Sequence, residues 1–162
     1  MLETTEESVT SALKRARATV EQRRVADGSH QPPPRPGSAE ERTIIEQLTA
    51  AYEGGDVTAV VALMTEDVWL TMPPGPLEYQ GRHLAERFLR AVAFTPGRQL
   101  RLVEAATRAN GAPAFGFYVV DPLTGVGHGI GLLVITLAGT KVSSVVRFEN
   151  SVFEAFGLSR TL

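Results

Sequence analysis

The chain has 162 residues, 43% of them hydrophobic and 21% charged, and its formal net charge at pH 7 is −2. This balance is typical of a soluble globular protein, and no stretch reaches the ~18 apolar residues of a membrane-spanning helix. The absence of cysteine excludes disulfide bonds, thiolate nucleophiles and cysteine-ligated zinc. The three histidines, His30, His83 and His128, lack metal-ligand spacing, so we expect no metal and no cofactor. The charged first 24 residues contain no apolar signal-peptide core, so we expect a cytoplasmic location without a membrane partner.

The first predicted element is an amphipathic helix over residues 4–24. Its apolar residues recur every three or four positions, which is the period of one helical face: Val9, Ala12, Leu13, Ala16 and Val20. Five basic residues and one acidic residue lie between positions 8 and 24, whereas the chain from residue 27 onward is mildly acidic. Such a basic stripe occurs in nucleic-acid-binding segments, although a solvated charged face is the commoner explanation.

A linker separates this helix from the rest of the chain. Four prolines and two glycines lie between residues 28 and 37, and each proline fixes φ and removes a hydrogen-bond donor. We therefore divide the chain into a helical leader (1–26), a Pro/Gly-rich linker (27–38) and a body (39–162).

The body begins with helical patterns and ends with strand patterns. Ser38, with Glu41 three residues later, predicts a helix start, and that helix ends at Gly54. Further patterns predict a helix from Asp56 to Met64, a strand over 67–72, a helix over 82–93, and strands over 99–109, 114–121, 127–137 and 141–149. Because the breaks between the last four strands are short, we expect antiparallel neighbours.

The resulting fold class is α+β, with three helices packed on a curved antiparallel sheet. Gly127, Gly129 and Gly131 recur at a period of two within one predicted strand. A strand interior tolerates missing side chains mainly where it bends or where another group approaches closely. A bent sheet over helices would enclose a conical cavity.

The order of motifs in the body resembles a known fold family. The chain has A-Y-E-G-G-D in the first helix, V-V-A-L-M-T-E-D-V in the second, then W-L-T-M-P-P, Y-Q-G-R and a strand meander. This order resembles the SnoaL-like branch of the nuclear transport factor two-like superfamily over residues 39–162. The resemblance implies a cone-shaped domain with a central cavity.

The leader resembles a second family. Its sequence L-E-T-T-E-E-S-V-T-S-A-L-K-R-A-R resembles the recognition helix that closes region 4 of extracytoplasmic-function sigma factors of the sigma-70 class. One subgroup follows this helix with a Pro-rich linker and a SnoaL-like domain that carries T-M-P-P, R-F and F-G-L. This chain has Thr71-Met72-Pro73-Pro74, Arg147-Phe148 and Phe156-Gly157-Leu158.

The second resemblance implies partners and DNA-contacting residues. In a full-length sigma factor the partners would be promoter DNA and the RNA polymerase core. The residues that would meet a promoter are Ser8, Thr10, Ser11, Lys14, Arg15 and Arg17. Region 2 and the earlier part of region 4 are absent from this sequence, so we expect a C-terminal piece that does not bind DNA selectively by itself.

The cavity predicts a pocket for a small apolar ligand. Aromatic and imidazole groups are its candidate lining: Trp69, Tyr79, Phe88, Tyr118, His128 and Phe148, with Phe94 as a further aromatic. A plain hydrophobic core would explain most of the phenylalanines equally well.

Relatives of the fold include isomerases, dehydratases and cyclases, whose chemistry needs an acid and a base inside the cone. The candidates here are His83, Asp121, His128 and Glu149, with Tyr79 or Tyr118 as hydrogen-bond donors. His128 is the best single candidate for a base, Asp121 before Pro122 suits a turn, and Glu149 with Arg147 suits a surface pair. No two of them form a dyad by spacing, so we assign no catalytic residue.

The sequence therefore predicts a regulatory accessory domain of a sigma factor that modulates transcription initiation in cis. Two alternatives stay open. One is a small-molecule enzyme of the isomerase or cyclase type with an incidental leader helix, and the other is a module that forms a homodimer through its open sheet face.

Overall fold

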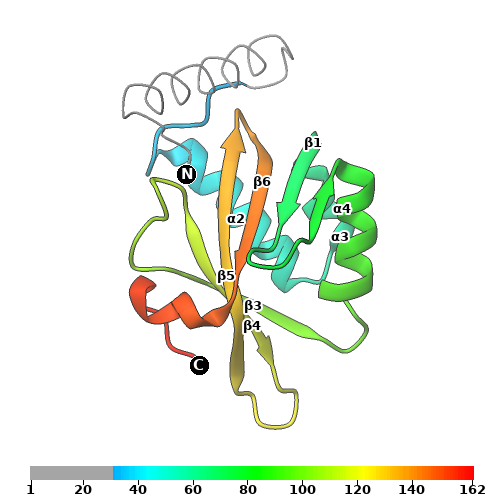
Figure 1. The fold of residues 1–162 in the computed structure, drawn as a ribbon, viewed down its shortest axis with the longest axis vertical. Coiled ribbons are helices and arrows are strands. Elements are labelled where there is room, and N and C mark those ends of the chain that lie inside the picture. The colour runs from blue at the N-terminus through cyan, green and yellow to red at the C-terminus, as the bar shows by residue number, and fades with distance from the viewer. Residues whose placement is uncertain (1–30) are drawn as a thin grey trace, which may run out of the picture. The chain divides into compact units, whose positions relative to one another are not determined.

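Six strands form one sheet in the computed structural model, which describes residues 31–162 (Figure 1). They are β1 (Met64–Thr71), β2 (Glu78–Gln80), β3 (Gln99–Glu104), β4 (Ala114–Val120), β5 (Gly127–Ala138) and β6 (Lys141–Phe148). Their spatial order is β2-β1-β6-β5-β4-β3. The described chain from residue 33 onward forms one unit, and the predicted leader helix lies outside the described residues.

The three predicted helices of the body are present, and their starts follow from the sequence. They are α2 (Ala39–Glu53), α3 (Val57–Ala62) and α4 (Arg82–Phe88), which continues into the π-helical turn η1 (Leu89–Ala93). Ser38 caps α2 by accepting a hydrogen bond from the Glu41 amide at 3.2 Å, and Asp56 caps α3 by accepting one from the Ala59 amide at 2.9 Å. Each cap satisfies a backbone donor that would otherwise have no partner at the helix start.

The antiparallel pairing expected of the last four strands is confirmed, and β1 adds one parallel pairing to the sheet. β1 lies parallel to β6, with Leu70 opposite Val145, while the other neighbouring pairs are antiparallel. Short hairpin breaks constrain consecutive strands only, and β1 and β6 are far apart in the sequence. β1 also begins at Met64, so Asp67 lies inside a strand instead of at its start.

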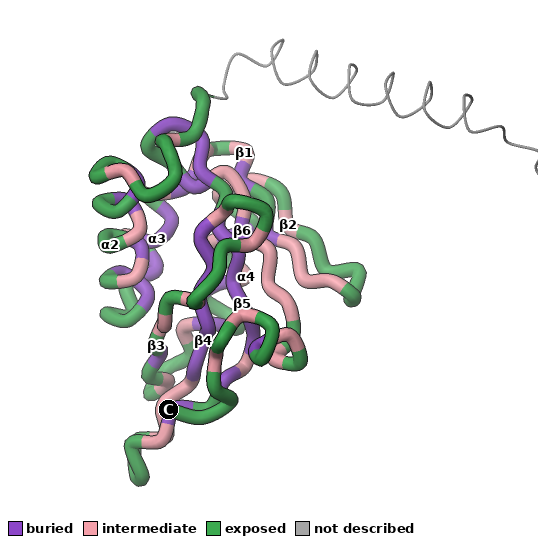
Figure 2. The backbone as a smooth tube through the Cα atoms, turned by 90° about the vertical axis from the view of Figure 1, so that its left-hand side faces the viewer, coloured by how far each residue is buried: buried purple, intermediate pink, exposed green. Residues whose placement is uncertain are grey.

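The two faces of the sheet carry two separate apolar clusters. Helices α2 and α3 cover one face, as Figure 2 shows, and the first cluster includes Leu48, Val60 and Leu133 there. The second cluster lies on the other face and includes Leu132 and Val134, packed against the 3-10 segment η2 (Asn150–Phe156). Alternate residues of β5 therefore serve opposite clusters, as the period of a strand requires.

A bulge in β5 changes which face its glycines occupy. Phe117 of β4 pairs with Gly131 and Tyr118 pairs with Gly129, so Ile130 is the extra residue. A Cβ on Gly129 would overlap the Phe153 ring, whereas a Cβ on Gly131 would lie 2.5 Å from the Phe148 carbonyl oxygen and 3.0 Å from the Arg147 Nε atom. The close approach expected at these glycines is confirmed, but the bulge places Gly129 and Gly131 toward different partners.

Candidate ligand-binding site

A cavity of about 320 Å³ lies between the sheet and the helices α2 and α4. This volume is at the lower end of the range of small-molecule pockets. Most of its lining is aliphatic or aromatic. The lining residues are Tyr52, Leu70, Thr71, Met72, Leu77, Tyr79, Phe88, Leu89, Val92, Ala93, Arg98, Phe117, Ile130, Leu133, Val145 and Arg147.

Two groups of contacting aromatic rings contribute to the wall, through Tyr79 and Phe88 in one and Tyr52 and Phe117 in the other. Tyr79 of β2 and Phe88 of α4 stack with their ring centroids 4.6 Å apart. Tyr52 of α2 contacts Phe94 at 5.4 Å and meets Phe117 edge to face at 6.0 Å. Such pairs hold the rings in place beyond the effect of their burial alone.

Tyr52 of α2 contributes a hydroxyl group to this wall. Tyr52 is 3% exposed and lines the cavity. Burial raises the pKa of Tyr52, so the phenol stays protonated and able to donate. A phenol hydroxyl can donate and accept a hydrogen bond, so Tyr52 adds a polar group to a largely apolar wall.

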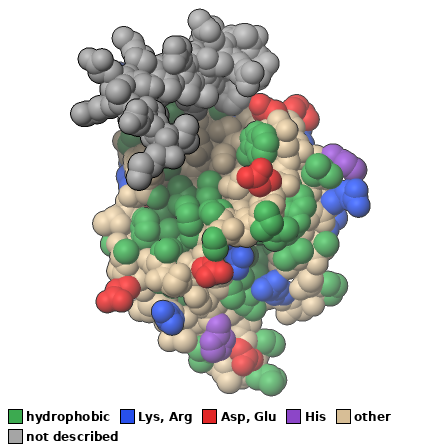
Figure 3. All heavy atoms as spheres, in the orientation of Figure 1, with side chains coloured by type: hydrophobic (Ala, Val, Ile, Leu, Met, Phe, Trp, Pro, Cys, Tyr) green, Lys and Arg blue, Asp and Glu red, His purple; other side chains and the backbone are tan. Residues whose placement is uncertain are grey.

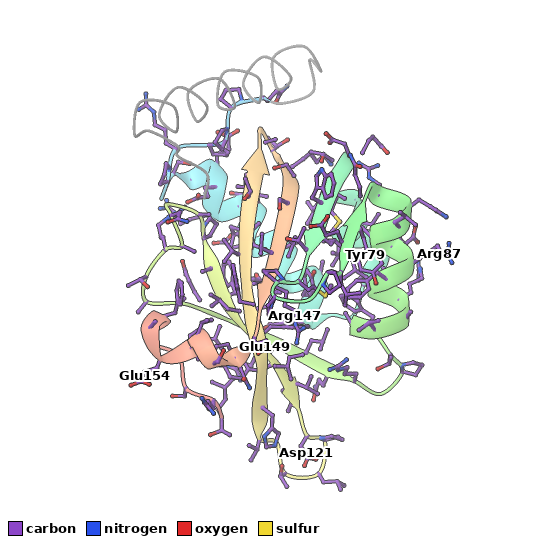
Figure 4. The ribbon with its side chains drawn as sticks, in the orientation of Figure 1. Tyr79, Arg87, Asp121, Arg147, Glu149 and Glu154 are labelled. Atoms are coloured by element: carbon purple, nitrogen blue, oxygen red, sulfur yellow. The ribbon has the colours of Figure 1, made fainter. Side chains whose placement is uncertain are left out.

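Two arginines supply the charge at the cavity. Arg147 near the end of β6 is half-buried and donates through Nη2 to the Ile130 carbonyl. Arg98, just before β3, donates through Nη1 to the Val92 carbonyl at 2.7 Å. Burial and the positive charge of Arg98 both lower the pKa of Arg147, and the Glu149 carboxylate partly opposes them. Figure 4 shows Arg147 and Glu149 near the same end of β6.

Gly131 explains how Arg147 fits at the cavity. Arg147 pairs with Leu133 across β5 and β6, on the face that lines the cavity. A Cβ at position 131 would lie 2.5 Å from the Phe148 carbonyl oxygen, and 3.0 Å from Nε and 3.3 Å from Cγ of Arg147. Glycine at this position therefore leaves room both for the β6 backbone at Phe148 and for the Arg147 side chain over β5.

Two of the six residues predicted to line a pocket lie in this cavity, Tyr79 and Phe88. The other four lie elsewhere because bulges and register, which local patterns do not reveal, determine the face of each strand. Trp69 is 40% exposed, and His128 is also exposed. Tyr118 is buried on the opposite face and donates a hydrogen bond to the Ser159 carbonyl at 2.7 Å.

Phe148 lines a separate groove of about 450 Å³ on that opposite face. The groove lies between β5, β6 and η2, and its apolar lining includes Leu132, Val134 and Phe156. Figure 3 shows hydrophobic side chains gathered on this face of the molecule.

The structure does not bring the candidate acids and bases together in the cavity. Asp121 accepts a hydrogen bond from the Leu123 amide at 2.8 Å, so it has the turn role that the sequence predicts. His83 and Glu149 are exposed, and none of the described residues that line the cavity is a carboxylate or an imidazole.

The interpretation of Arg147 and Glu149 as a surface pair is wrong for Arg147. β6 is an interior strand between β1 and β5, and Arg147 lines the cavity. Tyr52 and Arg98 were also missed as lining residues. The Arg147-Phe148 motif and Gly131 are the signals in the sequence that could have indicated this site.

The residues predicted to contact DNA, positions 8–17, lie outside the described part of the chain. Within residues 31–162 no group of three or more His, Asp or Glu side chains could hold a metal ion. No helix in the same range is long and apolar enough to cross a membrane.

Comparison with known proteins shows one sequence similarity across almost the whole chain. The sequence is 31% identical over 159 residues to the ECF RNA polymerase sigma factor SigG of Mycobacterium tuberculosis, strain CDC 1551 / Oshkosh. The match covers 96% of this chain and 41% of that relative, so the chain spans less than half of the relative's length. The same protein of strain H37Rv matches equally. No family model matches the chain.

Solved structures show the fold. An NTF-2 like protein of unknown function from Burkholderia xenovorans aligns over 68% of this chain and 82% of its own, with TM-score 0.55 and 13% identity. A putative ketosteroid isomerase from Kribbella flavida aligns over 68% and 77%, with TM-score 0.54 and 18% identity. SalBIII, an epoxide hydrolase/cyclase-like enzyme, aligns over 68% and 90%, with TM-score 0.54 and 21% identity. The expected NTF2-like, SnoaL-like fold and the expected resemblance to an extracytoplasmic-function sigma factor are both confirmed.

Proposed function

We propose that this chain acts as the C-terminal regulatory part of an extracytoplasmic-function RNA polymerase sigma factor. The observation that carries the proposal is the 31% identity to such a sigma factor over 96% of the chain. The similarity extends across the predicted leader, linker and body, and it is therefore not explained by the NTF2-like fold alone. Promoter DNA and the RNA polymerase core are the partners in the full-length protein, and its location is cytoplasmic.

The body modulates the activity of the sigma factor in cis through its cavity. The cavity has a largely apolar wall, the hydroxyl groups of Tyr52 and Tyr79, and two arginines. This combination suits binding, because an apolar surface provides affinity and a few polar groups fix orientation. A ligand that binds only the folded state stabilises it, and can thereby change how the body influences the rest of the protein.

An enzyme is the second candidate, since two of the fold relatives are named as a ketosteroid isomerase and a cyclase-like enzyme. Fold similarity alone does not transfer an activity. The described cavity lining offers arginines and tyrosines without a carboxylate or imidazole base, and this composition favours a binding pocket over isomerase-type proton transfer.

A transcription assay with purified components tests the proposal. The chain replaces the matching part of the mycobacterial relative, and a second protein lacks residues 39–162. We expect the first protein to initiate transcription with RNA polymerase core, and the deletion to change the amount or the promoter dependence of the transcript. Equal initiation by both proteins would contradict regulation in cis, while inactivity of the first alone would contradict the sigma-factor assignment. The unmodified relative is the control.

A further inference from the structure

The charge of Arg147 has no acidic partner at the cavity. Other described arginines form ion pairs with carboxylates: Arg82 with Glu66 at 2.7 Å, and Arg108 with Glu41 at 2.6 Å. Arg147 forms no salt bridge to any residue between 31 and 162, and the charged group beside it in the lining is a second arginine, Arg98. Two like charges near a low-dielectric wall repel each other, and burial penalises each of them.

The net charge of the groups at this end of the cavity suits a ligand with one negative charge. Arg98 and Arg147 contribute two positive charges, and the nearby Glu149 carboxylate, which is exposed, contributes one negative charge. A bound monoanion would neutralise the one positive charge that remains. Each guanidinium has five N–H donors, and each arginine uses Nη2 or Nη1 for one backbone carbonyl, so donors remain on both for a ligand.

The rest of the cavity fits an apolar body. Leu70, Leu133 and Val145 lie on the sheet side of the lining, and Phe88 and Leu89 lie on the helix side. A ligand that extended from the arginines into the cavity would contact these side chains instead of water over most of its apolar surface. The Tyr52 hydroxyl gives the wall a further hydrogen-bond donor besides the arginines.

We infer that the cavity binds a small apolar monocarboxylate, with its carboxylate held by Arg147 and Arg98 and its hydrocarbon body among the aliphatic and aromatic side chains. The planar guanidinium matches a carboxylate through paired hydrogen bonds, which gives orientation as well as affinity. The inference rests on the proposed function in one respect, since it names the class of ligand for the regulatory cavity. Binding of that ligand can be measured on this chain without any transcription assay.

Direct binding to the chain tests the inference, with decanoate as the probe and 1-decanol as its neutral counterpart. We expect saturable binding of decanoate by calorimetry, a higher melting temperature in its presence, and at least about tenfold weaker binding of 1-decanol. Comparable affinities for both probes, or no binding of decanoate up to about 1 mM, would overturn the inference.

Three variants assign the site. Arg147→Gln and Arg98→Gln should each weaken decanoate binding about tenfold or more, because each removes charged hydrogen bonds to the carboxylate. Arg87→Gln is the matched control, since Arg87 is exposed on α4, lies outside the lining and is seen on the outer side of that helix in Figure 4. Decanoate affinity that is unchanged in Arg147→Gln, or reduced equally in Arg87→Gln, would contradict the site.

A second measurement keeps the test decisive if a variant is unstable. Without ligand, Arg147→Gln should unfold at a temperature equal to or higher than the unmodified chain, because it removes a partly buried charge next to Arg98. A lower melting temperature without ligand would show that the hydrogen bond from Arg147 to the Ile130 carbonyl outweighs this repulsion, and the affinity of the folded variant for decanoate then decides the test. Binding of decanoate without any effect on transcription would contradict the proposed function alone, and a transcriptional effect of the body without decanoate binding would contradict this inference alone.

Discussion

Arg108 holds the carboxylate of Glu41 with two hydrogen bonds, of 2.6 and 3.1 Å, across 67 positions of the chain. Glu41 also accepts a hydrogen bond of 2.7 Å from the Gly37 amide, and the Arg108 Nε atom donates to the Gly111 carbonyl at 2.8 Å. The Glu41 side chain is 8% exposed. The pair therefore joins the end of the Pro-rich segment and the start of α2 to the loop between β3 and β4.

Glu41→Gln should destabilise the protein by on the order of 2–3 kcal/mol, because it leaves the partly buried Arg108 charge without its acidic partner. The free energy of unfolding in urea measures this effect. Glu86→Gln is the control, since Glu86 pairs with Arg90 on an exposed helix surface and its loss should change the stability by less than about 0.5 kcal/mol. Equal effects of the two substitutions would contradict the structural role of the Arg108–Glu41 pair.

The same pair predicts a dependence of stability on pH. Burial alone would raise the pKa of Glu41, but the hydrogen bonds from Arg108 and Gly37 and the charge of Arg108 lower it below its ordinary value of 4.5. A carboxyl whose pKa is lower in the folded state stabilises it above the unfolded pKa, and this stabilisation is lost as the pH falls through the folded pKa. The difference between the unmodified chain and Glu41→Gln should therefore be full at neutral pH and shrink below pH 4.5. A difference that grows on acidification would contradict this linkage.

Gly129→Ala should destabilise the protein by about 1–3 kcal/mol, because the added methyl group would overlap the ring of Phe153, which is fully buried. Gly127→Ala in the same strand is the matched comparison. There the new Cβ would lie 3.2 Å from the Leu162 side chain, at the end of the chain, which can move aside. Thermal unfolding of both variants shows which substitution destabilises the protein more. An equal or larger loss of stability at position 127 would contradict the packing of η2 on β5.

Tyr118→Phe should destabilise the protein by about 1 kcal/mol, because it removes the hydrogen bond to the Ser159 carbonyl and keeps the ring in place. The C-terminal segment also pairs with β5, where the Gly129 amide donates to the Arg160 carbonyl at 2.8 Å and the Leu162 amide donates to the Gly127 carbonyl at 2.9 Å. Hydrogen exchange at the Gly129 and Leu162 amides should become faster in the variant. Unchanged exchange at both amides would show that Tyr118 does not secure this segment.

The basic leader should give the chain weak DNA binding that depends on salt and not on sequence. Replacing Lys14, Arg15 and Arg17 with alanine removes up to three phosphate contacts. The slope of the logarithm of the DNA-binding constant against the logarithm of the salt concentration should then become less steep by up to about 2.7, because each contact releases counterions when it forms. Titration of labelled duplexes at several salt concentrations measures the slope. Submicromolar, sequence-selective binding by the unmodified chain at physiological salt would contradict the expectation that the recognition helix needs the rest of its motif.

Local sequence determined the helices, the long strands and their approximate ends. The apolar spacing and the caps at Ser38 and Asp56 indicated α2 and α3, because helix starts depend on residues only three positions away. The order of motifs was enough to identify the NTF2-like fold. The glycines of β5 correctly indicated close approach, since a missing Cβ has the same steric meaning in any register.

The tertiary structure alone decided which side chains share the cavity. The extra residue Ile130 and the parallel pairing of β1 with β6 set the face of each strand residue, and both depend on partners far along the chain. Tyr118 therefore faces the C-terminal segment, while Arg147 lies over Gly131 at the cavity. Alternation within one strand is a local property, but the face that becomes the inside is fixed only when the whole sheet has formed.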